Sequence, residues 1–177
     1  AILQSQSLQL EGLFINISTE GFCQNGYLDD ELEKCYKIIG EEKTEIITKL
    51  IAQSRFGIRE QDVCAVACRM GMNFTPMEFS LYRKMFRLHL IQRNDGRWDF
   101  SHAILRGTVD AENPELLKLT AEYVMTLPET DFIRQNELVY YLAESKMFQE
   151  LKERDPEGYR VAGEGEWGIT GGGYFRE

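Results

Sequence analysis

The stretch that decides the fold is FTPMEFSLYRKMFRLHLIQRNDGRWDFSHAILRGTV, residues 74–109. Thr75, Pro76 and Glu78 form a capping box with proline at the first helical position, which predicts a helix starting at Pro76. The apolar face predicted for this helix consists of Phe79, Tyr82, Met85, Phe86 and Leu90. Two short strand-like runs then flank the turn at residues 94–96, and an Asp-Gly turn between such runs predicts a β-hairpin.

Two more short helices are predicted immediately before this stretch. Apolar residues recur with helical spacing between Ile46 and Ile51, and a second helical run extends from Arg59 to Met70, before Gly71. Three short helices followed by a hairpin is the element order of a winged helix-turn-helix domain. The sequence therefore predicts such a domain over residues 45–108.

The flanking segments are predicted to be helical as well. Residues 1–44 are expected to form helices separated by a glycine-containing loop. Residues 109–177 are predicted to begin with a helix capped at Asn113, continue with helices over Phe132–Ala143 and Met147–Glu153, and end in a glycine-rich tail. Antiparallel helices with brief links predict the start of an α-superhelical repeat. The expected fold class is mainly α, with a winged helix, its small β-hairpin wing and the first repeat helices.

Charge and composition restrict the possible partners. The 177 residues carry a formal net charge of −9, which argues against general affinity for nucleic acid or anionic membranes. The charge is unevenly distributed: residues 72–109 hold 6 basic and 3 acidic side chains, a net charge of +3, between two acidic segments. The sequence has no apolar run long enough to span a bilayer, and we expect no membrane partner.

The chain start and the cysteines suggest a location. The first residues carry neither an initiator Met nor a secretory signal, so we expect a fragment of a longer chain. The four cysteines lack the spacing of a disulfide framework, which suits a reducing compartment, and we expect the protein to be cytoplasmic.

No pattern predicts chemistry in this chain by itself. Gly163, Gly165 and Gly168 have G-x-G-x-x-G spacing but lack a βαβ unit, and no P-loop motif is present. Cys64 and Cys68 lie four residues apart, which favours a helix interface over a zinc site. No nucleophile, base and orienting group have a spacing that links them. We therefore predict no catalytic residue, no metal site and no enzymatic activity.

The basic middle segment leaves one alternative open. A winged helix that reads DNA would present basic residues on its third helix and wing. The candidates for such a role are Arg83, Lys84, Arg87, Arg93 and Arg97. The same residues are also suited to meet an acidic protein surface, so a winged-helix transcriptional regulator is the alternative function.

His102 lies between the second hairpin strand and the next predicted helix. A histidine at such a junction can contact a phosphate or can be satisfied by local hydrogen bonds, and the residues leave both roles open.

The order of motifs resembles a known family. Residues 54–66 (SRFGIREQDVCAV), the stretch 74–109, residues 119–129 (LTAEYVMTLPE) and residues 136–151 (NELVYYLAESKMFQEL) are similar to the section after the nucleotide-binding module of NACHT-type STAND ATPases. The resemblance covers residues 45–155. In that family, a winged helix follows the ATPase module and leads into a helical superhelix.

The resemblance implies a regulatory function. Residues 1–44 would be the last helices of the ATPase module, and residues 45–177 would couple its nucleotide state to a sensor repeat. The partners would be the intramolecular ATPase module, the downstream repeats and other proteins. His102 aligns with the histidine of the M-H-D-like motif, which contacts the ADP phosphate beside the ATPase module. This chain has Ser101 and Ala103 where that motif has Met and Asp. No cofactor is expected on the fragment itself, and ADP or ATP would bind the longer parent.

Overall fold

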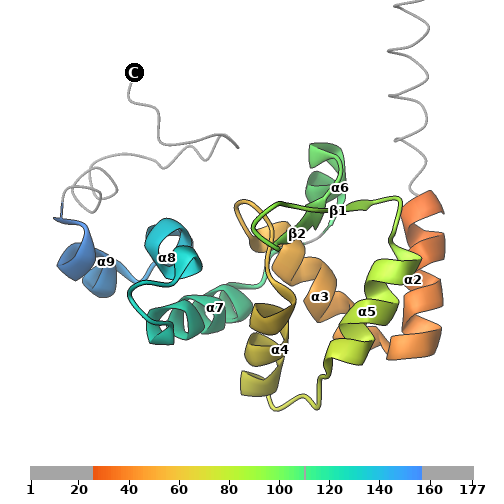
Figure 1. Cartoon of the computed structure of the whole chain (residues 1–177), viewed down its shortest axis with the longest axis horizontal. Coiled ribbons are helices and arrows are strands. Elements are labelled where there is room, and N and C mark those ends of the chain that lie inside the picture. The colour runs from red at the N-terminus through yellow and green to blue at the C-terminus, as the bar shows by residue number, and fades with distance from the viewer. Residues whose placement is uncertain (1–25, 110, 157–177) are drawn as a thin grey trace, which may run out of the picture.

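The computed structural model describes residues 26–109 and 111–156 (Figure 1). This part of the chain is mainly helical, with one two-stranded antiparallel sheet. The elements in order are α2 (Gly26–Ile39), α3 (Glu41–Gln53), α4 (Glu60–Arg69), α5 (Pro76–Met85), β1 (Leu90–Gln92), β2 (Trp98–Phe100), α6 (Ala103–Thr108), α7 (Pro114–Thr126), α8 (Phe132–Glu144) and α9 (Phe148–Arg154). The helix expected near the chain start and the glycine-rich tail lie outside the described residues.

The local start signal of α5 is confirmed. The Glu78 carboxylate accepts a hydrogen bond from the Thr75 backbone N–H at 2.8 Å, and Pro76 occupies the first helical position. Lys43 Nζ on α3 donates to the same carboxylate group at 2.6 Å. The cap therefore also attaches the start of α5 to α3.

The hairpin is confirmed, and its first strand begins at Leu90, the first residue of the expected strand-like run. Leu90 was also expected on the apolar face of the preceding helix, which is wrong, because it belongs to β1 and pairs with Phe100 of β2. The helix ends at Met85, with Phe86 as its C-cap. The chain turns after Phe86, so Leu90 reaches the core from the strand and remains buried.

Helix α3 forms the centre of the core. It contacts α2, α4, β2 and α6, and it is drawn between them in Figure 1. Such an environment requires a helix that is apolar on most sides, and Ile46, Ile47, Leu50 and Ile51 are all buried. Its buried Thr48 hydroxyl forms a hydrogen bond of 2.9 Å with the Tyr82 hydroxyl of α5.

The core continues into the C-terminal helices. Helix α4 contacts α7, α7 contacts α8, and α8 contacts α9. One cluster of buried apolar side chains includes Ile47 of α3, Leu116 of α7, Leu142 of α8 and Leu151 of α9. The described residues on both sides of position 110 therefore share a single hydrophobic core.

Gly57 attaches the hairpin to the loop between α3 and α4. Its φ of 87° lies in the left-handed region, and a Cβ built there would approach the Trp98 carbonyl oxygen to 2.4 Å. This close approach lets Ile58 and Trp98 exchange backbone hydrogen bonds of 2.9 and 2.8 Å. Only glycine satisfies both the backbone conformation and the available space.

Candidate functional site

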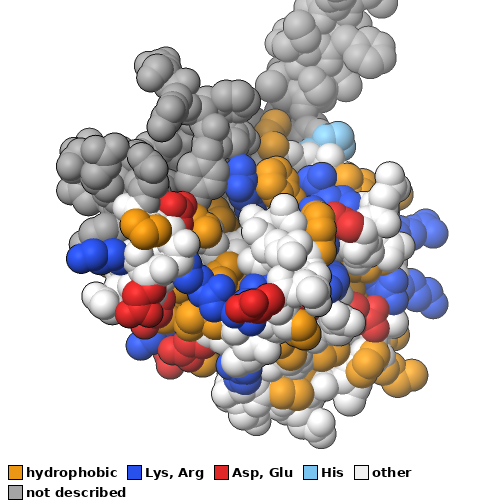
Figure 2. Space-filling model, turned by 60° about the vertical axis from the view of Figure 1, so that its left-hand side comes forward, with side chains coloured by type: hydrophobic (Ala, Val, Ile, Leu, Met, Phe, Trp, Pro, Cys, Tyr) orange, Lys and Arg blue, Asp and Glu red, His pale blue; other side chains and the backbone are white. Residues whose placement is uncertain are grey.

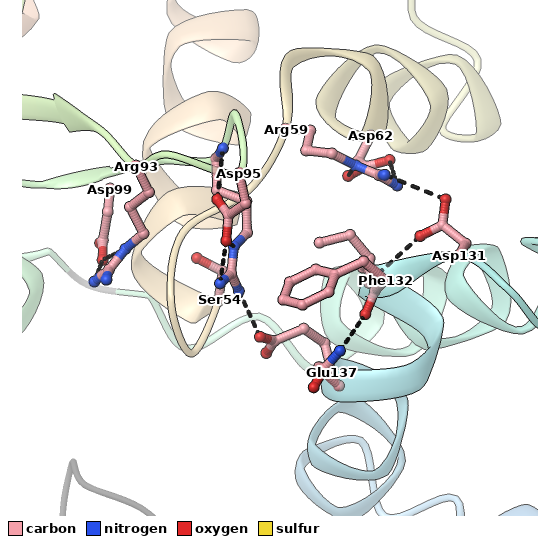
Figure 3. Close-up of polar contacts among 12 residues, drawn as sticks. Ser54, Arg59, Asp62, Arg93, Asp95, Asp99, Asp131, Phe132 and Glu137 are labelled. Carbon is pink, nitrogen blue, oxygen red and sulfur yellow. Dashed lines mark hydrogen bonds and ion pairs between the residues drawn. The ribbon is translucent and has the colours of Figure 1, made fainter.

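A cluster of charged side chains lies where the hairpin and α4 meet α7 and α8 (Figure 3). We call it the charged junction. Its members come from the start of α4, the hairpin turn, the N-cap of α8 and the middle of α8, and they are Arg59, Asp62, Asp95, Arg97, Asp131 and Glu137.

Arg97 and Glu137 form the buried ion pair of the charged junction. Only 6% of Arg97 and 2% of Glu137 is exposed. Arg97 Nη1 donates to Glu137 Oε1 at 2.6 Å, while Arg97 Nε and Nη2 donate to Asp95 Oδ2 at 2.9 and 2.7 Å. The first contact joins the hairpin to α8, and the second fixes the guanidinium within its own turn.

Two aromatic rings enclose the Arg97 guanidinium. Its central carbon lies 5.6 Å from the Phe56 ring centroid and 5.4 Å from the Phe132 ring centroid. Arginine is suited to such a site because its planar cation both stacks on rings and donates in fixed directions. Phe56 precedes Gly57 and Phe132 begins α8, so the stacking also crosses from one part of the fold to the other.

Arg59 joins α4 to the start of α8. Its Nε and Nη2 donate to the two carboxylate oxygens of Asp62 at 2.7 and 3.0 Å, and its Nη1 donates to Asp131 Oδ2 at 3.2 Å. Asp131 is also the N-cap of α8, where it accepts from the Ile133 N–H at 2.8 Å. The Tyr123 hydroxyl of α7 donates to Asp62 at 2.7 Å. Three helices therefore depend on one connected set of hydrogen bonds.

At the base of the hairpin, Arg93 and Arg106 both form ion pairs with Asp99. The buried Asp99 carboxylate accepts from Arg93 Nη2 at 2.6 Å and from Arg106 of α6. Arg106 also donates to the Ala52 carbonyl oxygen at 2.9 Å, near the end of α3. The strand pair is thus connected to α3 and α6 as well as to α8.

Burial and the mutual attraction of the two groups shift the pKa values of Glu137 and Arg97. Burial raises the pKa of Glu137 above its ordinary value, and the attraction of Arg97 does not reverse this shift. Burial alone would lower the pKa of Arg97, but hydrogen bonds to Asp95 and the charge of Glu137 raise it overall. Glu137 is therefore the member of the pair whose charge is most costly to bury.

Part of this cost comes from the second oxygen of Glu137. Its Oε2 is buried and has no hydrogen-bond partner among the residues that the structure describes. A cavity of about 10 Å³, lined by Asp62, Tyr123, Glu137 and Tyr141, lies beside it. A volume of this size accommodates one water molecule and no larger ligand.

The five basic residues named for DNA binding have different environments. Arg97 is buried in the charged junction, Arg93 pairs with Asp99, and Arg83 pairs with Glu60 at 3.3 Å while its guanidinium carbon lies 4.6 Å from the Trp98 ring centroid. Lys84 and Arg87 on and just after α5 are exposed. On the face shown in Figure 2, basic side chains alternate with acidic and apolar ones and do not form a continuous basic field.

His102 lies at the surface directly before α6. Its backbone is extended, with φ −133° and ψ 135°, and it occupies the N-cap position of the helix, without a side-chain cap hydrogen bond. The neighbouring Ser101 N–H donates to the His89 carbonyl oxygen at 2.8 Å, which fixes the loop against the residue directly before β1. The imidazole of His102 is exposed.

The cysteines and acidic residues of the described part of the chain were candidates for a metal site. In residues 26–109 and 111–156, no group of three or more His, Cys, Asp or Glu side chains is arranged to hold a metal ion. Cys64 and Cys68 are free thiols on α4, and burial raises the pKa of the Cys35 thiol to about 12. Within the same residues, no helix has the length and apolar character needed to cross a membrane.

The charged junction was missed by reasoning from the sequence, which treated Arg97 as a surface residue of the wing. A signal for Glu137 does exist, because Ile133 and Tyr141 lie four positions before and after it and are both buried. A glutamate on that helical face must either be paired or stay neutral.

Comparisons with known proteins found no relative of this chain. No family model, no curated protein and no solved structure matches this chain.

Proposed function

We propose that this protein is a regulatory interaction module of a STAND-type NTPase switch. In this proposal, residues 45–108 form a winged helix, residues 109–177 begin a superhelical repeat, and residues 1–44 are the last helices of an upstream ATPase module. The module transmits nucleotide state to a downstream sensor and acts in the cytoplasm without catalytic activity of its own. ADP or ATP is held by the longer parent, and other proteins bind the repeat.

The observation that carries the proposal is the buried contact between Arg97 and Glu137. A regulatory module must pass a displacement from one domain to the next, and rigid-body movement of packed domains requires a stiff connection. The charged junction provides one, because hydrogen bonds join the hairpin to α8, and join α4 to α7 and to the N-cap of α8. The shared hydrophobic core supports the same function.

His102 is the proposed contact to the ADP phosphate, and it acts only beside the ATPase module. Its exposure supports this role, since the imidazole is accessible to a neighbouring domain. We expect His102→Ala to speed ADP release from the longer parent by about 10- to 150-fold, because a hydrogen bond to a charged group contributes about 1.5–3 kcal/mol and each 1.4 kcal/mol is a factor of ten. The measurement is the release rate of a fluorescent ADP analogue. Lys118→Ala on the exposed face of α7 is the control, and an unchanged rate for His102→Ala contradicts the proposed contact.

The alternative function is a DNA-binding transcriptional regulator. The observation that favours it is the exposure of Lys84 near the end of α5 and of Arg87 just after it. Against it stand the internal pairing of Arg97 and the net charge of −9.

A binding titration separates the two functions. We expect the chain to bind neither fluorescent duplex DNA, at low or at moderate salt, nor fluorescent ADP in the absence of the ATPase module. Tight DNA binding that falls steeply with salt and is lost in the Lys84→Ala/Arg87→Ala variant would contradict the switch function and support a DNA-binding regulator. Those two side chains are exposed, so the variant tests contact with DNA without disturbing the core.

A further inference from the structure

One edge of the hairpin sheet carries backbone groups that the fold does not use (Figure 1). The Arg93 N–H donates to the Arg97 carbonyl oxygen at 2.8 Å, so these two residues form a hydrogen-bonded pair across the hairpin. Hydrogen-bonded and non-hydrogen-bonded pairs alternate along an antiparallel ladder. Leu90 and Gln92 therefore belong to non-hydrogen-bonded pairs, and their N–H and C=O groups point away from β2.

The outward groups of β1 differ in what already binds them. The Leu90 N–H donates to the Phe86 carbonyl oxygen at 3.0 Å. The Leu90 carbonyl oxygen and both backbone groups of Gln92 form no backbone hydrogen bond within the described part of the chain. On the opposite edge of the sheet, Trp98 exchanges hydrogen bonds of 2.8 and 2.9 Å with Ile58. The edge of β1 is therefore the open one, with two acceptors and one donor.

This edge is accessible from solvent. Ile91 is 44% exposed and Gln92 is exposed as well, and β2 is the element against which β1 packs. Edge strands in natural proteins are commonly protected by a charge, a proline or a bulge. The strand Leu90–Gln92 contains no charge and no proline, and its register with β2 is continuous. An extended segment can therefore add to β1 as a further strand.

The geometry of the edge defines what an added antiparallel strand must contain. The residue opposite Gln92 exchanges two hydrogen bonds with it, and the residue opposite Leu90 donates to its carbonyl oxygen. The residue between them lies opposite Ile91 in a non-hydrogen-bonded pair, where side chains are closest. A β-branched residue in that place covers the exposed surface of Ile91. The added strand ends near Leu90, because the Phe86 carbonyl oxygen already accepts from the Leu90 N–H.

The charge around the edge selects an acidic segment. Arg93 lies two residues after Ile91 and on the same face of the strand, and its side chain remains 39% exposed although it pairs with Asp99. Arg87 is exposed as well, and residues 72–109 carry a net charge of +3. A second copy of the chain would bring the same positive segment to the edge and be repelled. A carboxylate opposite Arg93 would instead be attracted.

We propose that the edge of β1 binds an extended acidic peptide of a partner protein as an antiparallel strand. The peptide places a β-branched residue opposite Ile91 and a carboxylate, two residues earlier in its sequence, opposite Arg93. Its backbone pairs with the three free groups of Leu90 and Gln92. The proposal goes beyond the regulatory function and does not rest on it.

The test is a titration of the isotope-labelled chain with the peptide acetyl-Thr-Glu-Thr-Val-Thr-amide, followed by backbone amide chemical shifts. In the proposed register, its valine lies opposite Ile91 and its glutamate opposite Arg93. We expect saturable shifts at residues 90–93 and slower hydrogen exchange of the Gln92 amide, which gains an acceptor. Glutamine in place of the peptide glutamate should weaken binding about twofold to fivefold, the range for one exposed pair of opposite charges.

Two methylated peptides test the backbone pairing. An N-methyl group on the threonine before the valine removes the donor to the Gln92 carbonyl oxygen, and we expect about tenfold weaker binding. An N-methyl group on the valine changes an N–H that points away from β1, so binding should stay within twofold. Equal binding of the two methylated peptides, or a larger loss for the valine one, contradicts the proposal.

Two variants at position 92 locate the binding. Gln92→Pro removes the outward N–H and keeps the pairing of β1 with β2, because an edge strand tolerates proline where the N–H faces solvent. We expect this variant to lose peptide binding, whereas Gln92→Thr keeps the N–H and binds within twofold of the unmodified chain. The proposal is overturned if the peptide does not saturate or if Gln92→Pro binds it like the unmodified chain. It is also overturned if the free chain dimerises in sedimentation and Gln92→Pro abolishes the dimer, because a second copy then occupies the edge.

Discussion

Gly57→Ala lowers the free energy of unfolding by about 2–5 kcal/mol, the sum expected for a left-handed non-glycine residue and an overpacked contact. The new Cβ would meet the Trp98 carbonyl oxygen at 2.4 Å and the Asp99 Cβ at 2.9 Å. Neither neighbour can move easily, because Trp98 pairs with Ile58 and Asp99 is held by two arginines. Urea denaturation followed by circular dichroism measures the loss.

Gly71→Ala is the control for this variant. Gly71 has φ 81°, close to that of Gly57, but a Cβ there meets no atom within 4 Å. We expect it to cost only the backbone penalty, about 1–2 kcal/mol. Equal losses for the two variants would show that contact between Gly57 and β2 does not limit stability.

Glu137→Ala is the second change with a large expected effect, a loss of about 3–5 kcal/mol, as found when one partner of a buried ion pair is removed. The truncation leaves Arg97 Nη1 without its acceptor at 2.6 Å and enlarges the small cavity that Glu137 lines. Asp95 still holds the other side of the guanidinium, so the cation stays in place and stays buried. Denaturation midpoints of the variant and of Gln135→Ala, an exposed change on the same helix, provide the comparison.

Glu137→Gln separates charge from shape at the same position. Gln keeps an acceptor for Arg97, and burial already raises the pKa of Glu137, so we expect this variant to lose about 1 kcal/mol or less at neutral pH. The folded carboxyl holds its proton more tightly than the unfolded one, whose pKa is near 4.5. The stability gained from that proton is complete below pH 4.5 and is lost as pH rises through the folded value. The unmodified chain should therefore gain stability relative to Glu137→Gln as the pH falls. The opposite trend would mean that Arg97 outweighs the burial of Glu137.

Local signals in the sequence were sufficient for most of the secondary structure. The capping box at Thr75, the Asp-Gly turn and the Asn113 cap each act within four residues, and the structure has a helix or hairpin at every one of them. Such short-range hydrogen bonds depend on neighbours in the chain, so a sequence read by itself contains both partners.

The charged junction depends on partners that are distant in the sequence. Arg97 and Glu137 are 40 residues apart, and Arg59 and Asp131 are 72 apart. A charged residue in a hairpin is exposed by default, so Arg97 was predicted on the surface. Its burial follows from how α8 packs beside the hairpin, which no local pattern encodes. The spacing of Glu137 between Ile133 and Tyr141 indicates a buried acid but does not identify its partner.

If the charged junction is stiff, α3 to α6 and α7 to α9 form a single mechanical unit. Native-state amide hydrogen exchange measures this directly, because each slow amide reports the free energy of the opening that exposes it. We predict that the slowest amides of α3 and α8 exchange with the same opening free energy, equal to that of global unfolding. Exchange of α8 through a separate opening of lower free energy, with α3 still protected, would contradict the claim and leave the two parts free to move independently.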